Sequence, residues 1–533
     1  MNILPMLLAD FYKLSHKRLY DTENAVIYST WTPRKSRLKG VDKVVFFGLQ
    51  GFIKKYLIDY FNENFFKQDI DVIVTEYKRI LSNTIGGEIE TEHIRALWNL
   101  GYLPIKIQAL PEGTLTPIRV PMFTIENTKP EFYWITNFLE TLMSAEIWKP
   151  MTSATLALQY RKIVEKWAEK TCPEFNVEYQ AHDFSFRGLT SVECACTSGA
   201  GHLTIFKGTD TVPAICYLEK YYNADVEKEV VGTSIPATEH SIMEFNSYGS
   251  ETDEYNAFKR MITEVHPSGF VSIVSDTWNL WEVLTKTVPS LKQEILNRDG
   301  KVVIRPDSGD PCDIICGLNT KGSHEDFMDK ALNHMDATNM KEALADVPYI
   351  EQQMKGVVEL LWDTFGGTIN EKGYKVLDSH IGCIYGDAIT MERCDEICRR
   401  LESKGFAAEN VVFGIGSYTY NMNTRDTFGF ALKTTYAKQG ETEMQLYKDP
   451  ITDDGTKKSQ KGKVAVIPVE EVDTGKLVLT YVDGLNEDAK QSFKKDDLLQ
   501  TVYEDGKLVQ EYTLQQVRDL LQSQIKEKEV VTA

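Results

Sequence analysis

Four segments of this chain share one pattern, a short apolar run that ends in small, acidic or basic residues. They are residues 271–274, 302–304, 383–385 and 411–413, and each lies between helical stretches. Short runs rich in β-branched residues in that setting are typical of buried parallel strands. In sheets and barrels of parallel strands, ligands bind at the C-terminal ends of the strands. The pattern therefore predicts an α/β fold with a polar site at one edge, and Arg, Asp and small residues there suit a phosphorylated sugar.

Composition narrows the class of ligand. With 533 residues the chain can bury a large core and form two domains, and 42% hydrophobic with 11% aromatic residues indicates a globular protein. The net charge of −19 argues against a nucleic-acid partner, which needs clustered Lys and Arg. A small anionic substrate remains compatible with this charge, because it responds to the local field of a pocket.

Cysteine usage and the N-terminus indicate the compartment. The nine cysteines contain no CxxC pair, which predicts buried free thiols in a reducing cytosol. The first residues lack the basic region and long apolar core of a signal peptide. No apolar stretch approaches the roughly 20 residues that a membrane helix needs. We therefore expect a cytoplasmic protein without a membrane partner.

The order of predicted elements indicates two domains. Residues 151–425 alternate between an extended piece, a polar end and a helix, which favours a parallel α/β barrel over an open sheet. Residues 1–150 and 426–533 mix helices and strands, and we expect them to form a second, α+β domain from both chain ends. Within the barrel, residues 317–355 are predicted to be an insertion. Near the C-terminus, Asp505-Gly506 predicts a tight hairpin.

Three of the polar ends could hold phosphate and ribose. Arg305 offers a rigid fork for phosphate oxygens, and Asp307 could accept hydrogen bonds from vicinal ribose hydroxyls. Gly416 lets backbone amides approach a phosphate, and Arg425 follows it in the chain. The Gly386-Asp387 pair repeats the combination of a small residue and an acid. Each segment taken alone is also explained as a plain turn.

Three further positions could carry chemistry. His240, after a proline turn, could be a general base, a metal ligand or a phosphoryl acceptor, although the absence of HExxH or cysteine partners argues against zinc. Phe184 with Arg187 could hold a flat heterocycle by stacking. Asp210 adds an acid at another strand end. The structural alternatives are a helix cap for His240, a core strand with a surface Arg, and a helix N-cap for Asp210.

Along nearly its whole length, the chain resembles the nicotinamide phosphoribosyltransferases, a family of type II phosphoribosyltransferases. The matching motifs are DFYK (10–13), PR (33–34), FGLQ (47–50), LPI (103–105), HDFSFRG (182–188), FKGTDTV (206–212), PATEHS (236–241), VSD (274–276), IRPDSG (304–309), GD (386–387), TRD (424–426) and KDP (448–450). The resemblance implies a homodimer of α/β-barrel subunits with the active site at the subunit interface. It also implies a pentosyltransferase of NAD salvage. Nicotinamide and phosphoribosyl pyrophosphate would give nicotinamide mononucleotide and pyrophosphate, with Mg²⁺ on the pyrophosphate and ATP hydrolysis coupled through a phosphohistidine.

The resemblance also implies roles for individual residues. Nicotinamide would stack between Phe184 and Tyr12 of the partner subunit, with Arg187 at the ring edge and Asp210 accepting from the carboxamide. His240 would be the phosphorylated histidine, acting with Arg305 and Asp307 as the catalytic group. The ribose and phosphate contacts would be Ser275, Arg305, Asp307, Gly386, Asp387, Gly416, Ser417 and Arg425. The ATP phosphates would meet Arg34, Lys433, Lys448, Lys457 and Lys463. No residue is assigned as a metal ligand.

The chain departs from the family pattern at a few positions. Ser417 stands where a glycine is expected, Asn279 where an Asp is expected near His240, and Lys463 where an Arg is expected. These changes predict a less open phosphate loop, an altered network at His240 and a lost bidentate contact. Two alternative functions remain open: a nicotinate phosphoribosyltransferase, and a non-catalytic sensor of NAD metabolites on the same scaffold.

Overall fold

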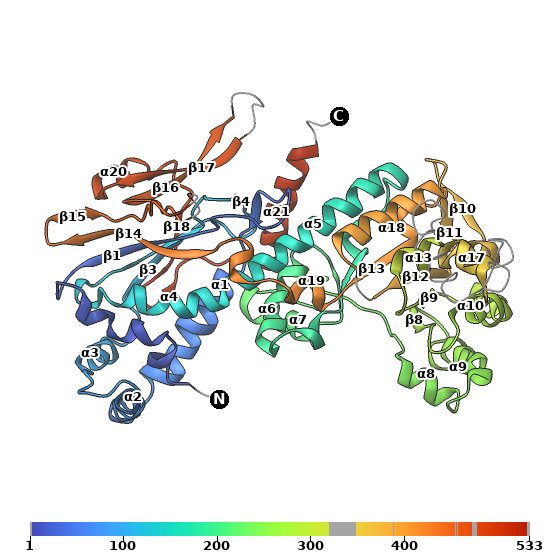
Figure 1. The fold of residues 1–533 in the computed structure, drawn as a ribbon, viewed down its shortest axis with the longest axis horizontal. Helices are drawn as coiled ribbons and strands as arrows, with labels where there is room; N and C mark the ends of the chain where they lie inside the picture. Colours follow the sequence, from blue (N-terminus) through green and yellow to red (C-terminus); the bar gives the residue numbers. More distant parts are fainter. Residues whose placement is uncertain are drawn as a thin grey trace.

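A six-stranded parallel sheet, in the order β7-β6-β13-β12-β9-β8, forms one half of the computed structural model (Figure 1). The structure describes residues 3–318, 348–386, 389–453, 455, 457–471 and 477–529. The parallel strands are β6 (Ala181–Asp183), β7 (Gly208–Thr209), β8 (Val271–Val274), β9 (Val302–Arg305), β12 (Ile381–Tyr385) and β13 (Val411–Ile415). All four apolar runs noted in the sequence are thus strands of one sheet, side by side.

Residues 233–238, which we name the closing segment, join the two edges of this sheet. At one edge the Thr209 amide donates to the Thr233 carbonyl (2.9 Å). At the other edge the Ser272 amide donates to the Pro236 carbonyl (2.8 Å). The sheet therefore curls back on itself, and the predicted barrel architecture is confirmed.

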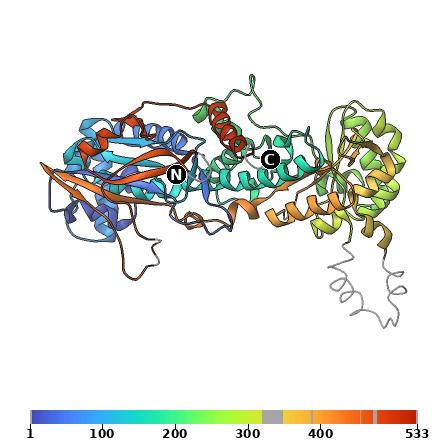
Figure 2. The same ribbon diagram turned by 90° about the horizontal axis from the view of Figure 1, so that it is seen from above.

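Helices surround the barrel, and the long helix α5 leads from it toward the other half of the molecule (Figures 1 and 2). The principal barrel helices are α5 (Trp148–Thr171), α6 (Val192–Leu203), α7 (Val212–Tyr222), α8 (His240–Asn246), α9 (Glu254–Arg260), α10 (Leu280–Glu282), α13 (Pro311–Cys316), α16 (Ile350–Lys355), α17 (Val357–Phe365), α18 (Met391–Ser403) and α19 (Ser417–Asn421). Most of the predicted insertion, residues 319–347, lies outside the described residues.

A seven-stranded antiparallel sheet, built from both chain ends, forms the other half (Figure 1). Its strands are β1 (Val26–Thr32), β3 (Ile105–Ala109), β5 (Phe123–Asn127), β14 (Ala431–Gln439), β15 (Thr442–Gln445), β18 (Gln500–Glu504) and β19 (Lys507–Leu508). Helices α2 (Ile70–Thr84), α3 (Glu92–Leu100) and α4 (Ile135–Glu146) accompany it, with the short helix η2 (Phe11–Leu19). A separate hairpin pairs β16 (Lys463–Glu470) with β17 (Leu477–Leu485).

The hairpin between β18 and β19 illustrates local sequence control. Asp505 and Gly506 both have positive φ (48° and 81°), which a two-residue turn matched to the strand twist requires. The predicted Asp-Gly hairpin is therefore confirmed.

Two hydrophobic cores correspond to the two sheets, with one exchange between them. The last helix α21 (Leu514–Glu529) contributes Leu514, Val517 and Leu521 to the barrel core, although it follows the antiparallel sheet in the chain. Its Arg518 donates to the Leu203 carbonyl at the end of α6 and to the carbonyls of Val230 and Val231, just before the closing segment. The domain boundaries predicted at residues 150 and 425 stay a prediction. They assign α21 to the α+β domain, whereas its apolar side chains pack in the barrel core.

Two further expectations concern the whole chain. All nine cysteines are free, as predicted, but the prediction that they are buried holds for six of them, because Cys216 is exposed and Cys194 and Cys196 are partly buried. In the part of the chain that the structure describes, no helix is long and apolar enough to span a bilayer.

Candidate active site

A cavity of about 1090 Å³ opens at the C-terminal ends of the parallel strands. It gathers most of the residues predicted for the barrel part of the site: Phe184, Arg187, Asp210, His240, Arg305, Asp307, Gly386, Gly416 and Ser417. Asp387 lies outside the described residues. The other lining residues are Phe186, Gly188, Thr211, Ala237, Thr238, Glu239, Ser241, Ile242, Ile389, Tyr418 and Thr419. Loops from successive strands thus converge on one cavity.

Phe184 presents a half-buried ring to this cavity. It follows β6 directly, and its ring centroid lies 4.7 Å from that of His182, two residues earlier on the same face. A Cβ at Gly414 would lie 2.5 Å from a carbon of the Phe184 ring, so only glycine fits on the neighbouring strand. The missing side chain lets the ring lie close against the strand ends, where it can stack on a flat ligand.

Asp210 is held by two donors on one oxygen. The Nε2 of His182 lies 2.8 Å from Asp210 Oδ1, and the Ser234 hydroxyl donates to the same Oδ1 at 2.5 Å. Burial raises the pKa of Asp210, but the bonds from His182 and Ser234 and the charge of Arg305 outweigh it and lower the pKa below its usual value. Asp210 is therefore an ionised acceptor facing the cavity.

Arg305, the last residue of β9, places a guanidinium between carboxylates. It donates through Nη2 to the Thr238 carbonyl, while its buried Nε has no hydrogen-bond partner among the described residues. Burial lowers the pKa of Arg305, and the charges of Asp307, Asp210 and Asp276 oppose that shift. A buried donor without a partner in a polar cavity suits an anionic ligand, because leaving it unmet costs free energy.

His240 is the first residue of α8 and contacts the end of β8. Its Nε2 lies 3.3 Å from Asp276 Oδ1. The other Asp276 oxygen accepts from the amide of Asp307 (3.0 Å) and the hydroxyl of Ser308 (2.5 Å). Asp276 therefore joins the imidazole to the loop that follows Arg305. Asn279 is not part of this contact, because its side chain instead accepts from the Glu282 amide at the start of α10.

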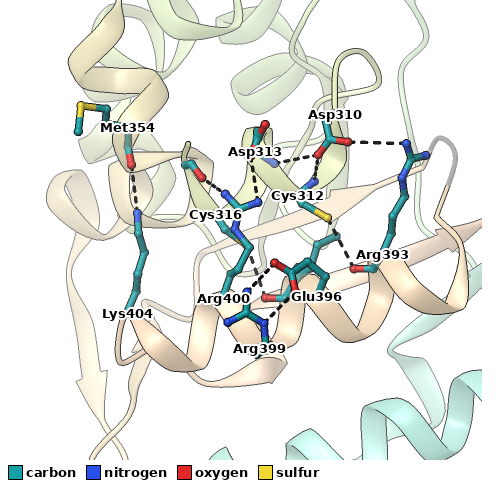
Figure 3. A network of polar contacts seen from close by, with 12 residues as sticks. Asp310, Cys312, Asp313, Cys316, Met354, Arg393, Glu396, Arg399, Arg400 and Lys404 are labelled. Carbon is teal, nitrogen blue, oxygen red and sulfur yellow. Dashed lines mark hydrogen bonds and ion pairs between the residues drawn. The ribbon is translucent and has the colours of Figure 1, made fainter. Parts of the chain in front are cut away.

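Polar contacts join the helices that follow the loops after β9 and β12 (Figure 3). Helix α13 follows the Arg305 loop, and α18 follows the Gly386 loop. Arg400 of α18 donates to Asp313 of α13 (2.9 Å) and to the Gly317 carbonyl, and Arg393 lies 3.7 Å from Asp310. These contacts fix two neighbouring loops of the site relative to each other.

Glu254 lies buried on α9, near Asp276. Burial, and then the charges of Glu251, Asp276 and Glu282, raise the pKa of Glu254 from 4.5 to about 7. Its side chain favours the folded state when protonated, so its contribution is full below about pH 4.5 and is lost as the pH rises through about 7.

Glu254→Gln should therefore raise the free energy of unfolding at pH 8 by about 1–3 kcal/mol and change it little at pH 5, because the amide stays neutral. Urea unfolding at the two pH values measures this difference. Glu244→Gln, an exposed carboxylate that is not among the charges acting on Glu254, serves as the control and should leave the difference between the two pH values close to that of wild type. A stability loss at pH 8 in Glu254→Gln would contradict the assignment.

Several predicted residues do not line this cavity. Ser275 is buried and donates to the Ile273 carbonyl (2.7 Å), which points its hydroxyl back along β8. Tyr12 lies on η2 in the other half of the molecule and is 59% exposed. Arg425, on the 3₁₀ turn Arg425–Thr427, and Arg34 lie near each other, and burial followed by the Arg425 charge lowers the pKa of Arg34. Lys433 lies 3.5 Å from Glu140.

The loop that carries Lys448 and Lys457 lies on the same half as Arg34. Both lysines are exposed, and the Lys457 amide donates to Asp453, whose charge acts on Arg34. The predicted cations for the ATP phosphates thus do not line the cavity of their own chain.

Lys463 does not fit the predicted phosphate role. It is buried between the rings of Tyr28 and Tyr436, and its Nζ pairs with Glu126 (2.8 Å) and Glu487 (2.7 Å). Burial lowers the pKa of Lys463, but these carboxylates outweigh it and raise the pKa. The ammonium group of Lys463 is therefore already paired with two carboxylates inside the antiparallel half, which makes Lys463 a structural ion-pair residue.

Three functional contacts were missed from sequence. His182, Ser234 and Asp276 all touch predicted site residues. The signals were present: His182 alternates with Phe184 on β6, Ser234 opens the PATEHS region, and Asp276 ends the apolar run of β8. The sequence does not show which segments that are far apart in the chain lie close together in the fold, so these contacts could not be predicted from it.

A second cavity of about 450 Å³ lies within the barrel. It shares Phe184, Asp210, Ala237 and Arg305 with the first and continues toward Lys301 and Glu409. His182 and Ser234 line this inner cavity, so their contact with Asp210 lies where the two cavities meet.

Comparisons with known proteins agree with this geometry. The model of the nicotinate phosphoribosyltransferase (NAPRTase) family matches residues 179–507. The nicotinamide phosphoribosyltransferase of Acinetobacter baylyi is 46% identical over 536 residues, 98% of each chain. That of Xanthomonas campestris pv. campestris is 33% identical over 525 residues, 96% of this chain and 97% of the relative.

A solved structure supports the fold independently. The crystal structure of nicotinate-nucleotide pyrophosphorylase from Pyrococcus furiosus superposes with a TM-score of 0.52 at 14% identity, covering 98% of this chain and 95% of that chain. At that identity the likeness concerns the fold alone. From the family model and the two relatives together, we conclude that the chain belongs to the nicotinate phosphoribosyltransferase family, which confirms the resemblance indicated by its motifs.

Proposed function

We propose that this chain is a nicotinamide phosphoribosyltransferase of NAD biosynthesis. It would transfer the phosphoribosyl group of phosphoribosyl pyrophosphate to nicotinamide, giving nicotinamide mononucleotide and pyrophosphate. The observation that carries the proposal is the meeting of three groups in one cavity: the Phe184 ring, the Asp210 acceptor and the half-buried Arg305 guanidinium. The names of the two bacterial relatives favour the amide over the acid as the substrate.

The chemistry needs positioning more than a strong nucleophile. The ring nitrogen of nicotinamide attacks C1′ of the ribose as the bond from C1′ to the pyrophosphate oxygen breaks, and pyrophosphate leaves with the electron pair. The transition state should be oxocarbenium-like, so orientation and charge stabilisation supply most of the rate. Phe184 would hold the ring, Asp307 the ribose hydroxyls and Arg305 a phosphate. Gly416 and Ser417 would present backbone amides to the 5′-phosphate.

Mg²⁺ would enter as part of the substrate complex. Among the residues that the structure describes, no group of three or more His, Cys, Asp or Glu side chains is arranged to hold a metal. Mg²⁺ is usually bound by one or two carboxylates together with substrate phosphates. Asp307 lines the cavity beside Arg305 and is the carboxylate placed to share such an ion.

ATP stimulation through a phosphohistidine is the second part of the proposal. His240 lies at the cavity wall with Nε2 against Asp276, and Nδ1 is the ring nitrogen left for a phosphoryl group. Transfer would form an Nδ1–P bond and break the bond to the leaving ADP oxygen, and later hydrolysis would return phosphate and the free imidazole. Asp276 would hold the proton on Nε2 while the phosphoryl group is in place.

A homodimer would complete the site. Tyr12, Arg34 and Lys433 lie in the antiparallel half and do not line the cavity of their own chain. In a two-fold pair with the subunits antiparallel, this half of each subunit would face the barrel of the other, which would bring Tyr12 against Phe184 and the cations against the phosphates. A shared active site of this kind follows a closed two-fold arrangement. We place the reaction in the cytoplasm, in keeping with the nine free thiols.

Base selectivity tests the proposal. Nicotinamide can donate to Asp210, whereas the carboxylate of nicotinate would meet it as a like charge without a donor. Asp210→Asn should lower the ratio of kcat/KM for nicotinamide over nicotinate by about tenfold or more, because a like-charge contact or an unmet buried acceptor costs roughly 1–3 kcal/mol. A side-by-side assay with both bases gives the ratio. An unchanged ratio would remove Asp210 from the account of selectivity, and a wild-type preference for nicotinate would favour nicotinate phosphoribosyltransferase.

A further inference from the structure

The carboxylate of Asp210 is fixed in an unusual way for a substrate acceptor. Both of its donors, His182 Nε2 (2.8 Å) and Ser234 Oγ (2.5 Å), reach the same oxygen, Oδ1. Across the described residues, Oδ2 has no hydrogen-bond partner. The Asp210 amide also donates to the Asp183 carbonyl (2.9 Å), which fixes the backbone beneath the carboxylate. One oxygen is thus occupied by the protein, and the other is left for a ligand.

The two donors come from different elements of the barrel and lie side by side, with Ser234 Oγ 3.4 Å from His182 Nε2. His182 lies on β6, within the sheet and 9% exposed. Ser234 lies on the closing segment, where Thr233 is paired to Thr209 at the sheet edge. Because both donors stand on backbone that is itself hydrogen-bonded, their positions do not depend on a bound ligand. The acceptor geometry is therefore built before the base arrives.

His182 can act as a donor in either of its protonation states. The carboxylate at 2.8 Å requires a proton on Nε2, and both the neutral Nε2–H tautomer and the imidazolium supply it. Ser234 has one hydroxyl proton and gives it to Oδ1. Two donors on one oxygen keep the carboxylate ionised and stop it from rotating to share both oxygens with the ligand.

We propose that His182 and Ser234 are positioning residues that set base specificity, by holding Asp210 so that a single free oxygen faces the ring substituent. This rests on the proposed function, since it assumes that Asp210 meets the carboxamide. A carboxamide N–H can donate to the free oxygen. The carboxylate of nicotinate would instead meet the ionised Asp210, which cannot rotate and does not readily take up a proton. Loss of either donor frees Asp210 to rotate or to protonate, and a protonated Asp210 could donate to nicotinate.

The test compares Ser234→Ala and His182→Leu with wild type, using nicotinamide and nicotinate as separate substrates at saturating phosphoribosyl pyrophosphate. Each variant should lower the ratio of kcat/KM for nicotinamide over nicotinate by about tenfold, since a hydrogen bond to a charged group has that worth. KM for phosphoribosyl pyrophosphate should stay close to the wild-type value. His182→Gln and Ser234→Thr keep a donor and should restore most of the ratio.

Ser185→Ala is the matched control. The Ser185 hydroxyl donates to Asp183 Oδ1 at 2.6 Å, so the change removes the same kind of bond near β6 without touching Asp210. It should leave the ratio at the wild-type value even if overall activity falls. Thermal melts identify any variant that fails to fold, and the conservative variants then carry the comparison.

The outcomes separate the inference from the function beneath it. Selective loss in Ser234→Ala and His182→Leu, with rescue by the conservative pair, supports the inference. If both truncated variants keep the wild-type ratio, or lose activity equally with the two bases, the positioning role of His182 and Ser234 is overturned. The proposed function would still stand in that case, provided that the wild-type protein turns over nicotinamide. No turnover of either base by the wild-type protein would instead overturn the proposed function itself.

Discussion

Arg305→Met is expected to lower kcat/KM for phosphoribosyl pyrophosphate by roughly 10²–10³-fold, the usual loss when a preorganised charge donor is removed from a transition state. The guanidinium ends β9 inside the cavity, its Nε is buried without a partner, and the carboxylates of Asp307 and Asp210 keep it in place. Methionine preserves the length of the side chain and removes every donor. Initial rates of pyrophosphate release at varied phosphoribosyl pyrophosphate measure the loss.

Arg298→Met provides the control for burial of an arginine. Arg298 is buried and, like Arg305, has an Nε without a partner among the described residues, but it does not line the cavity and its Nη atoms donate to the carbonyls of Ile262, His266 and Gly269. It should lower thermal stability while leaving kcat/KM within a few-fold of wild type at temperatures where the variant is folded. If Arg305→Met and Arg298→Met lose activity equally, Arg305 does not act on the substrate.

His240→Ala is expected to abolish the whole stimulation of synthesis by ATP, while weak synthesis without ATP remains. The imidazole is the only group proposed to carry the phosphoryl group, so the variant should also take up no acid-labile label from γ-³²P-ATP. Rates with and without ATP, combined with ³¹P NMR of the protein, measure both effects. Asp276→Asn keeps the imidazole and should weaken coupling rather than abolish it, because Nε2 loses its carboxylate.

Full ATP stimulation in His240→Ala would show that energy coupling takes another route. Loss of ATP-independent synthesis by more than about tenfold would show that His240 acts in the transfer step as well. In either case the proposed roles of Phe184 and Asp210 in binding the base, and of Arg305 in binding phosphate, would be unaffected.

The sequence predicted the barrel because its signals are local. Short β-branched runs between helical stretches, such as residues 302–304, are typical of buried parallel strands, and the polar residues that follow such strands meet at one end of the sheet. That reasoning placed Arg305, Asp307, His240 and Phe184 in one cavity, where the structure has them. The Asp505-Gly506 turn followed equally directly, because few residues accept two consecutive positive φ angles.

Contacts between distant segments were beyond this reasoning. From the resemblance, Lys463 was expected at the ATP phosphates in place of a family Arg, but only the fold reveals that Glu126 and Glu487 pair with its ammonium group. Ser275 was expected to contact the ligand, yet its hydroxyl donates to the Ile273 carbonyl. The bond from Ser234 to Asp210 depends on closure of the barrel by residues 233–238, which no short motif encodes.

The most direct test is product analysis of the purified protein with nicotinamide, phosphoribosyl pyrophosphate and Mg²⁺, with nicotinate in a parallel reaction. We expect nicotinamide mononucleotide and pyrophosphate in equal amounts, formed faster when ATP is present, and much slower turnover of nicotinate. Binding of nicotinamide without any release of pyrophosphate, with or without ATP, would contradict the account and favour a sensor of NAD metabolites.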